Sequence, residues 1–181
     1  SIRSPEGEEL PVGAAGEVGH MIVMADGPYC GCGNRGCIEA LASRTAIVQS
    51  LRMAVKSGRK TALADALAGP GIEQVSSGAL AQAWKNNDPL VVEVLSRVQF
   101  YLGLHLASLV NFLDPELIVL GGGVMEALGD DFLQPIRRVA YQHFTQRRDA
   151  NQVKIVISQL GDNAGILGAA ATARLHLNSK S

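Results

Sequence analysis

The residues of this sequence best suited to chemistry are one histidine and three cysteines near its N-terminus. His20 precedes Cys30, Cys32 and Cys37, and these are all the cysteines of the chain. One imidazole and three thiolates form a closed tetrahedral ligand set for a structural Zn²⁺ ion. Three cysteines leave one without a disulfide partner, and their confinement to one short loop favours a metal site over buried or redox thiols. The spacing therefore predicts a structural zinc site with no open catalytic position.

Two carboxylates flank this loop, Glu17 in the segment Glu17-Val18-Gly19-His20 and Glu39 two residues after Cys37. Carboxylates accept pairs of hydroxyl hydrogen bonds, so with a metal-bound imidazole they would make a rigid polar cup for a sugar. The alternative is that Glu17 is an ordinary loop residue and that Glu39 complements a helix dipole from the first turn. From spacing alone, the second interpretation is favoured for Glu39.

Two glycine-rich segments follow later in the chain. Residues 116–120 are expected to form a buried strand, and the turn Gly121-Gly122-Gly123 would let a ligand approach the backbone at the carboxyl end of a parallel sheet. This triplet matches neither the dinucleotide fingerprint nor the Walker loop, so a nucleotide contact and a plain tight turn are equally compatible with it. In the segment from Gly161 to Gly168, small residues are expected to let a helix pack closely on its neighbours.

Hydrophobic periodicity and turn residues predict strands that alternate with helices, and hence an α/β fold with a mainly parallel sheet. The predicted strands are 18–25, 116–120 and 153–158. The predicted helices are 38–56, 62–68, 79–85, 90–113, 132–146 and 164–175. Asp88 and Pro89 are the expected N-cap and first-turn pair of the longest helix.

Composition limits the class of protein. Of 181 residues, 47% are hydrophobic and 18% are charged, which is typical of one compact domain. The net charge of −1 disfavours binding of duplex DNA through this chain. The longest apolar stretch, 91–113, is interrupted by Glu93, Arg97, His105 and Asn111, which favours a buried helix over a membrane span. The N-terminus has no apolar signal region, and a thiolate-rich site indicates the reducing cytoplasm.

Taken together, the motifs resemble those of the ROK family, which is named for repressors, open reading frames and sugar kinases. The resemblance covers most of the chain from Gly13 to Ala173, and its most specific part is the histidine and cysteine spacing. The motifs occur in the family's order: 16–20 (GEVGH), 30–39 (CGCGNRGCIE), 120–123 (LGGG) and 161–168 (GDNAGILG).

The resemblance implies an actin-like ATPase fold, ribonuclease H-like, with an inserted zinc-binding loop and added helices. Residues 1–181 would form its C-terminal lobe. It also implies that Glu17, His20 and Glu39 hold sugar hydroxyls, with His20 serving both zinc and sugar. Gly121, Gly122 and Gly123 would lie at the adenosine of ATP, and residues 161–168 would begin a connecting helix at the hinge between lobes.

The sequence also departs from the family pattern. Family kinases begin with a D-x-G-x-T phosphate loop and carry an Asn-Asp pair before the E-x-G-H segment, whose Asp is the general base. Neither feature occurs at these places in residues 1–181. Phosphoryl transfer depends on positioning and charge stabilisation around the γ-phosphate. We therefore expect an N-terminal lobe outside this sequence, no catalytic residue within it, and little or no activity from this chain alone.

The resemblance implies an ATP-dependent, glucokinase-like hexose kinase. Its ligands would be ATP, Mg²⁺ and a hexose or N-acetylated amino sugar, and a cytoplasmic homodimer is expected. The alternative is a sugar-responsive transcriptional repressor, which shares this lobe and carries a DNA-binding domain ahead of it. A non-catalytic, zinc-stabilised interaction module is a third interpretation. Glu17 and Glu39 fit the kinase and the repressor equally.

Overall fold

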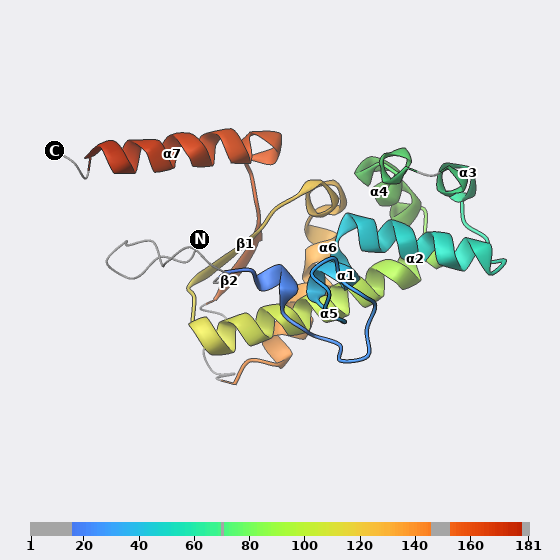
Figure 1. Ribbon diagram of the computed structural model, residues 1–181, viewed down its shortest axis with the longest axis horizontal. Coiled ribbons are helices and arrows are strands. Elements are labelled where there is room, and N and C mark those ends of the chain that lie inside the picture. The colour runs from blue at the N-terminus through green and yellow to red at the C-terminus, as the bar shows by residue number, and fades with distance from the viewer. Residues whose placement is uncertain (1–15, 70, 146–152, 179–181) are drawn as a thin grey trace.

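The computed structural model describes residues 16–69, 71–145 and 153–178, which fold as helices around one long central helix, with a small parallel sheet at one end (Figure 1). The helices are α1 (Ile38–Ala42), α2 (Arg44–Lys56), α3 (Ala64–Ala68), α4 (Ser77–Lys85), α5 (Pro89–Leu113), α6 (Gly123–Gln142) and α7 (Ala164–Asn178). Short 3-10 helices are η1 (Val18–His20), η2 (Ile72–Gln74) and η4 (Gly161–Asn163). The strands are β1 (Leu117–Leu120) and β2 (Lys154–Ile157).

Helix α5 is the centre of the hydrophobic core, and its predicted start is confirmed. The Asp88 side chain accepts hydrogen bonds from the backbone N–H groups of Leu90 and Val91, and Pro89 occupies the first turn. Asp114 ends the helix in the left-handed conformation. Within the described part of the chain, α5 is the one helix long and apolar enough to cross a membrane. Its buried residues pack against α1, α2, α4 and α6, so the core accounts for its apolar composition.

Helix α6 lies along α5 and begins nine residues before the predicted helix 132–146, directly after the glycine turn. The predicted start at residue 132 is wrong because Gly129, with φ of 71°, interrupts the helical conformation and divides the apolar pattern of α6. The two helices approach closely at Gly103, where an added Cβ would lie 2.6 Å from Cβ of Val139. The predicted C-terminal residue, Gln146, lies outside the described residues.

Strands β1 and β2 pair in parallel, with Leu117 beside Lys154 and Leu120 beside Ile157, and α6 forms the connection between them. This confirms the predicted α/β arrangement of the last third of the chain. The prediction that β1 is buried is wrong for one face, because Leu117 and Val119 are 50% and 54% exposed. Side chains alternate across a strand, so one face packs on the core while the other faces away from it.

Two predictions near the N-terminus are wrong. Residues 18–25 form η1 and a loop instead of a strand, because the backbone N–H groups of Val23 and Met24 both donate to the carbonyl of Gly36. The helix predicted at 38–56 is divided at Ser43, whose extended backbone ends α1 and whose side chain caps α2 by accepting from Ala46 N–H.

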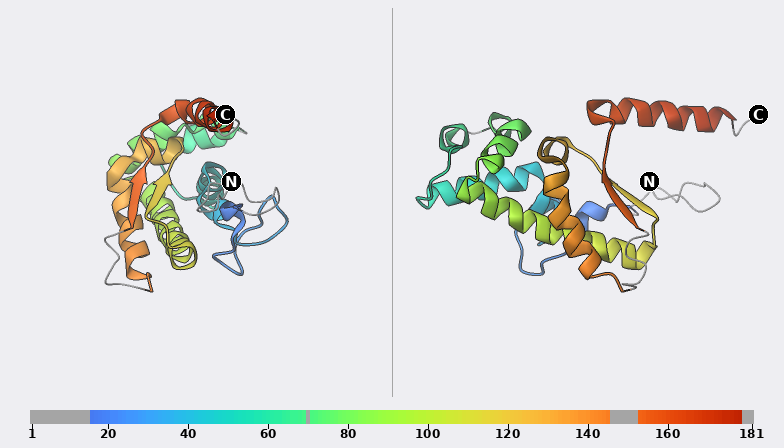
Figure 2. Two further views of the ribbon diagram at one scale, coloured as in Figure 1. Left: turned by 90° about the vertical axis from the view of Figure 1, so that its left-hand side faces the viewer. Right: turned by 180° about the vertical axis from the view of Figure 1, so that it is seen from behind.

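Helix α7 directly follows η4 and projects away from helices α1 to α6, as Figures 1 and 2 show. The close packing expected of its small residues is not found, because a Cβ added at Gly165 or Gly168 would meet no atom within 4 Å. Ile166 is 73% exposed and Leu167 is 48% exposed. Within the described residues, this helix therefore leaves apolar side chains uncovered.

Candidate metal centre and ligand cavities

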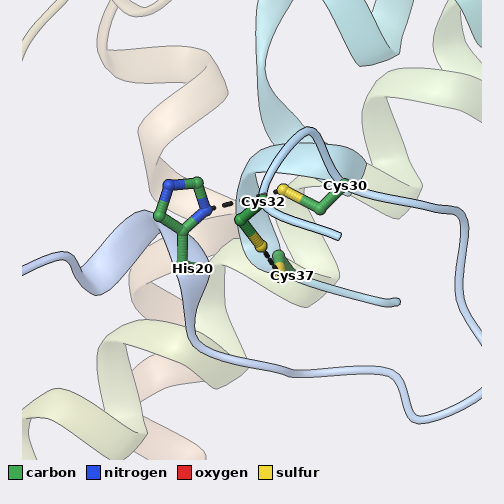
Figure 3. Close-up of side chains that lie close together, drawn as sticks. All are labelled: His20, Cys30, Cys32 and Cys37. Atoms are coloured by element: carbon green, nitrogen blue, oxygen red, sulfur yellow. Dashed lines mark hydrogen bonds between the residues drawn. The ribbon is translucent and has the colours of Figure 1, made fainter. Parts of the chain in front are cut away.

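The residues predicted to bind zinc lie together. The ligand atoms of His20, Cys30, Cys32 and Cys37 are all within 4.8 Å of one another. Cys30 Sγ lies 3.5 Å from His20 Nδ1, and Cys32 Sγ lies 3.7 Å from Cys37 Sγ (Figure 3). A tetrahedral zinc ion with Zn–S bonds of about 2.3 Å places two sulfurs roughly 3.8 Å apart. The cysteines are free thiols, so the donor set and its spacing both fit a bound Zn²⁺ ion.

Glycines and one arginine give the loop its tight path. Gly36 has φ of 73°, and a Cβ there would collide with the Met24 carbonyl oxygen. Tyr29 and Arg35 form an antiparallel bridge, and Arg35 Nε donates to the Gly27 carbonyl at 3.0 Å. Together these contacts fold the loop back, so that cysteines up to seven positions apart in sequence reach one point.

The three thiols have different electrostatic surroundings. Burial, followed by hydrogen bonding with Cys32, raises the pKa of Cys37 to about 12. The backbone hydrogen bond from Asn34 lowers the pKa of Cys32. A buried thiol with a raised pKa becomes a thiolate when a cation takes the place of its proton. A bound Zn²⁺ ion would therefore neutralise the negative charge of the Cys37 thiolate, which burial in the protein disfavours.

Two of the three predicted sugar-binding residues lie beside the metal cluster. Glu39 Oε2 is 3.7 Å from His20 Nδ1, and Gly19 lies against the same carboxylate. Cys37, the last residue of the cluster, is also the N-cap residue of α1, whose first turn carries Glu39. Figure 3 shows the second ring nitrogen of His20 on the side away from the cysteines.

Glu17 is positioned by its backbone. Its carbonyl accepts a hydrogen bond from the His20 N–H at 3.0 Å, which ties it to the start of η1. Its side chain is exposed, and among the described residues its carboxylate has no hydrogen bond or ion pair. The structure therefore brings His20 and Glu39 together and places Glu17 one turn away.

A cavity of about 440 Å³ opens beside Glu39, between the cysteine loop and α2. Its walls include Tyr29, Thr45 and Gln49, which combine an aromatic ring with a hydroxyl and an amide. Sequence reasoning did not select these residues, because a scattered aromatic and two helix-surface polar residues have no motif spacing. Their proximity to Glu39 appears only in the folded chain.

A second cavity, of about 380 Å³, lies at the glycine turn. Gly121, Gly122 and Gly123 line it, as does Ser43, which also lines the cavity beside Glu39. Gly122 has φ of 106° and ψ of 150°, a conformation that essentially only glycine adopts. The remaining walls are mainly apolar: Val98, Leu102, Leu120, Val124, Met125 and Phe132. A flat, mostly apolar group bound against glycine backbone fits this space. Arg44 and Ser77 also line it and were not predicted, because neither belongs to the glycine motif.

The two cavities share Ser43, and the cluster of His20 and the three cysteines lies beside them. The α/β framework resembles that of the ROK sugar kinases, which have an actin-like ATPase fold. The sequence profile of the ROK family matches residues 10–175. This chain belongs to the ROK family.

Known relatives include both enzymes and regulators. A glucokinase from Halalkalibacterium halodurans is 33% identical over 168 residues, which are 92% of this chain and 50% of that protein. A putative xylose repressor from Caldicellulosiruptor is 32% identical over 170 residues, 91% of this chain and 41% of that protein. The solved ROK family glucokinase from Streptomyces griseus, in complex with glucose and AMPPNP, is 30% identical with a TM-score of 0.73, and the match covers 93% of this chain and 55% of that one. The chain spans about half the length of the relatives it matches.

Proposed function

We propose that this chain is the zinc- and sugar-binding C-terminal lobe of an ATP-dependent, glucokinase-like hexose kinase. The observation that carries the proposal is the distance of 3.7 Å between Glu39 Oε2 and His20 Nδ1, beside the cluster that His20 forms with the three cysteines. Glu17 and Glu39 would accept hydrogen bonds from sugar hydroxyls, and the outward nitrogen of His20 would complete the cup. A structural zinc ion, when bound, fixes the imidazole and the first turn of α1.

The cavity at Gly121–Gly123 would hold the adenosine of ATP, with Mg²⁺ required by the phosphates. In the complete kinase, a primary hydroxyl of the sugar would lose its proton to the general base and form a bond to the γ-phosphorus. The bond from that phosphorus to the ADP oxygen would break. Residues 1–181 carry neither the family's base before the E-x-G-H segment nor its phosphate loop. This chain would therefore bind and orient the sugar and ATP, and an N-terminal lobe would supply the base.

The uncovered apolar faces support a missing lobe. Leu117 and Val119 on β1 and Ile166 on α7 are each at least half exposed. Apolar surface in contact with water is unfavourable, so another part of the fold is expected to cover this sheet face and this helix. The exposed Phe100 and Phe112 of α5 would serve a homodimer contact. The thiolate ligands favour a reducing compartment, which is the cytoplasm.

The second candidate function is a sugar-responsive transcriptional repressor, and the similarity to a putative xylose repressor supports it. Both functions need the sugar cup, so sugar binding alone does not separate them. The test is to sequence the DNA immediately upstream of the codon for Ser1. An in-frame D-x-G-x-T loop with an Asn-Asp pair would support the kinase. A winged helix-turn-helix, or a lobe without the catalytic Asp, would support the repressor and overturn the kinase.

Ligand binding separates both functions from a non-catalytic module. Isothermal titration of the zinc-loaded protein with glucose, N-acetylglucosamine and xylose should give saturable binding of one of them. Kinase function predicts a hexose or amino sugar as the preferred ligand, together with ATP binding. Absence of binding to every sugar tested, at millimolar concentration and with verified zinc content, would contradict both sugar-dependent functions.

A further inference from the structure

Arg44 is the charged residue in the wall of the cavity at the glycine turn. Among the described residues that line this cavity, it is the only one with a charged side chain, and no carboxylate accompanies it. It is the first residue of α2, directly after Ser43, which caps that helix. A single guanidinium at the edge of a mainly apolar cavity is an arrangement that binds flat aromatic ligands, because guanidinium groups stack on ring faces.

The guanidinium of Arg44 is held in place by main-chain carbonyls. Its Nη2 donates to the carbonyl oxygens of Ile72 at 3.2 Å and Val75 at 3.0 Å. Val75 leads through Ser76 into α4, where Ser77 lies against Gly123, with its Oγ 3.2 Å from a Cβ built there. Arg44 therefore links the start of α2 to the same rim of the cavity that the glycine turn forms.

The Nε of Arg44 is buried and has no hydrogen-bond partner among the described residues. This part of the guanidinium is therefore shielded from water by the protein itself. Removal of water from a cation strengthens its attraction to an aromatic face. A guanidinium that is held in place and partly shielded from water is therefore suited to contact a flat aromatic ligand.

We propose that Arg44 contacts the nucleotide base: its planar guanidinium covers one face of the adenine in the glycine-turn cavity. This inference rests on the proposed function, which places adenosine there, and adds the residue that recognises the ring. Stacking on a flat guanidinium depends on ring area, so purines bind more tightly than pyrimidines. The contact is with the base, so it does not depend on the phosphates.

Arg52 provides a matched control. Like Arg44, it belongs to α2 and donates to main-chain carbonyls of the connection between α2 and α4, those of Leu67, Gly69 and Gly71. It does not line the cavity. Replacement of Arg52 removes a comparable tether from the same connection without removing a wall of the cavity.

The experiment measures binding of ATP, CTP, adenosine and tripolyphosphate to the full 181-residue, zinc-loaded protein by isothermal titration calorimetry. The variants are Arg44→Lys, Arg44→Met, Arg52→Lys and Arg52→Met. We expect both Arg44 variants to weaken ATP and adenosine by about tenfold to thirtyfold, because an ammonium retains charge but lacks the planar face. Both Arg52 variants should bind adenosine like the wild type. Tripolyphosphate should bind all five proteins equally.

A nuclear magnetic resonance measurement on the unmodified protein does not depend on the variants being folded. Adenosine should shift the side-chain N–H resonances of the Arg44 guanidinium upfield, because this group would face the ring, and leave those of Arg52 in place. Wild-type affinity in both Arg44 variants, or an unshifted Arg44 resonance in the saturated protein, would overturn the proposal. Affinity retained by Arg44→Lys and lost by Arg44→Met would overturn it too, since that indicates a phosphate contact. If the wild type binds neither ATP nor adenosine, the nucleotide part of the proposed function fails, and this proposal fails with it.

Discussion

The carboxylate of Glu39 lies 3.7 Å from His20 Nδ1, and Cys37, two residues before Glu39, belongs to the same cluster as that imidazole. The proposed metal-binding residue Cys37 and the proposed sugar-binding residue Glu39 are therefore separated by less than one helical turn. Anything that displaces Cys37 moves Glu39, because Cys37 is the N-cap residue of α1. We therefore expect a change at the histidine and cysteine cluster to alter the position of Glu39 as well.

Zinc and sugar binding should be lost together when a cysteine ligand is replaced. Cys32→Ser removes a thiolate, and a serine hydroxyl is a poor zinc ligand at neutral pH. Only three of the four ligands of a closed tetrahedral site would remain, so we expect zinc content to fall to roughly half an equivalent or less. Glucose binding should become undetectable. Metal analysis and calorimetry on the same sample measure both quantities. Tyr29→Phe, in the same loop, is the control and should retain zinc. Undiminished sugar affinity in a protein verified to lack zinc would refute the coupling.

Replacement of Glu39 should weaken sugar binding without changing the zinc content. Glu39→Gln removes a charged acceptor, and hydrogen bonds to charged groups contribute about 1.5–3 kcal/mol, so sugar affinity should fall by roughly tenfold or more. Zinc content should not change, because no ligand atom is lost. Glu93→Gln is the matched control, since Glu93 is an exposed carboxylate on α5 paired with Arg59 at 2.8 Å. Loss of zinc from the Glu39 variant would show that this carboxylate supports the loop instead of the sugar.

Asp88 should be a major determinant of stability and of its pH dependence. Its Oδ1 accepts from the N–H groups of Leu90 and Val91, and its Oδ2 accepts from Thr61 and Ala62. Burial acts to raise the pKa of Asp88, but these hydrogen bonds outweigh it and leave the pKa below its ordinary value of 3.8. Asp88→Ala should lower the free energy of unfolding by about 2–3 kcal/mol at pH 7.

The sign of the pH effect follows from the lowered pKa. The stabilisation is present above the pKa of the unfolded chain and is lost as pH falls through the folded-state pKa. Urea unfolding of the wild type and of Asp88→Ala should therefore converge as pH falls below about 4. Asp131→Ala, at an exposed position on α6, should unfold like the wild type. A difference between wild type and Asp88→Ala that stays constant down to pH 3 would contradict this account.

Two glycine substitutions should have opposite effects. A Cβ at Gly103 would lie 2.6 Å from Val139 and 2.9 Å from the Ile136 carbonyl oxygen, so α5 and α6 would have to separate. Gly103→Ala should therefore destabilise the protein by about 1–3 kcal/mol, more than the helix propensity of alanine restores. At Gly78 in α4, the nearest atom to an added Cβ is Ser76 Oγ at 3.8 Å. Gly78→Ala should leave the melting temperature unchanged or raise it, and thermal unfolding followed by circular dichroism measures both.

The sequence by itself determined the local features that depend on a few neighbouring residues. The cysteine spacing predicted a cluster that the fold then formed, since three ligands lie within one short loop. Asp88 with Pro89 predicted the start of α5, because capping requires only the first turn. The parallel pairing of β1 with β2 followed from two short apolar runs separated by a helix.

Tertiary structure decided what depends on contacts between distant segments. Gly36 O accepts from Val23 and Met24, and this turned the predicted strand into a loop. The position of Arg44 in the cavity wall depends on carbonyls some thirty residues away, which no local pattern encodes. The approach of Glu39 to His20 needed both the loop and the start of α1. Local propensity acts within a few residues, whereas a binding site is defined by which surfaces the core brings together.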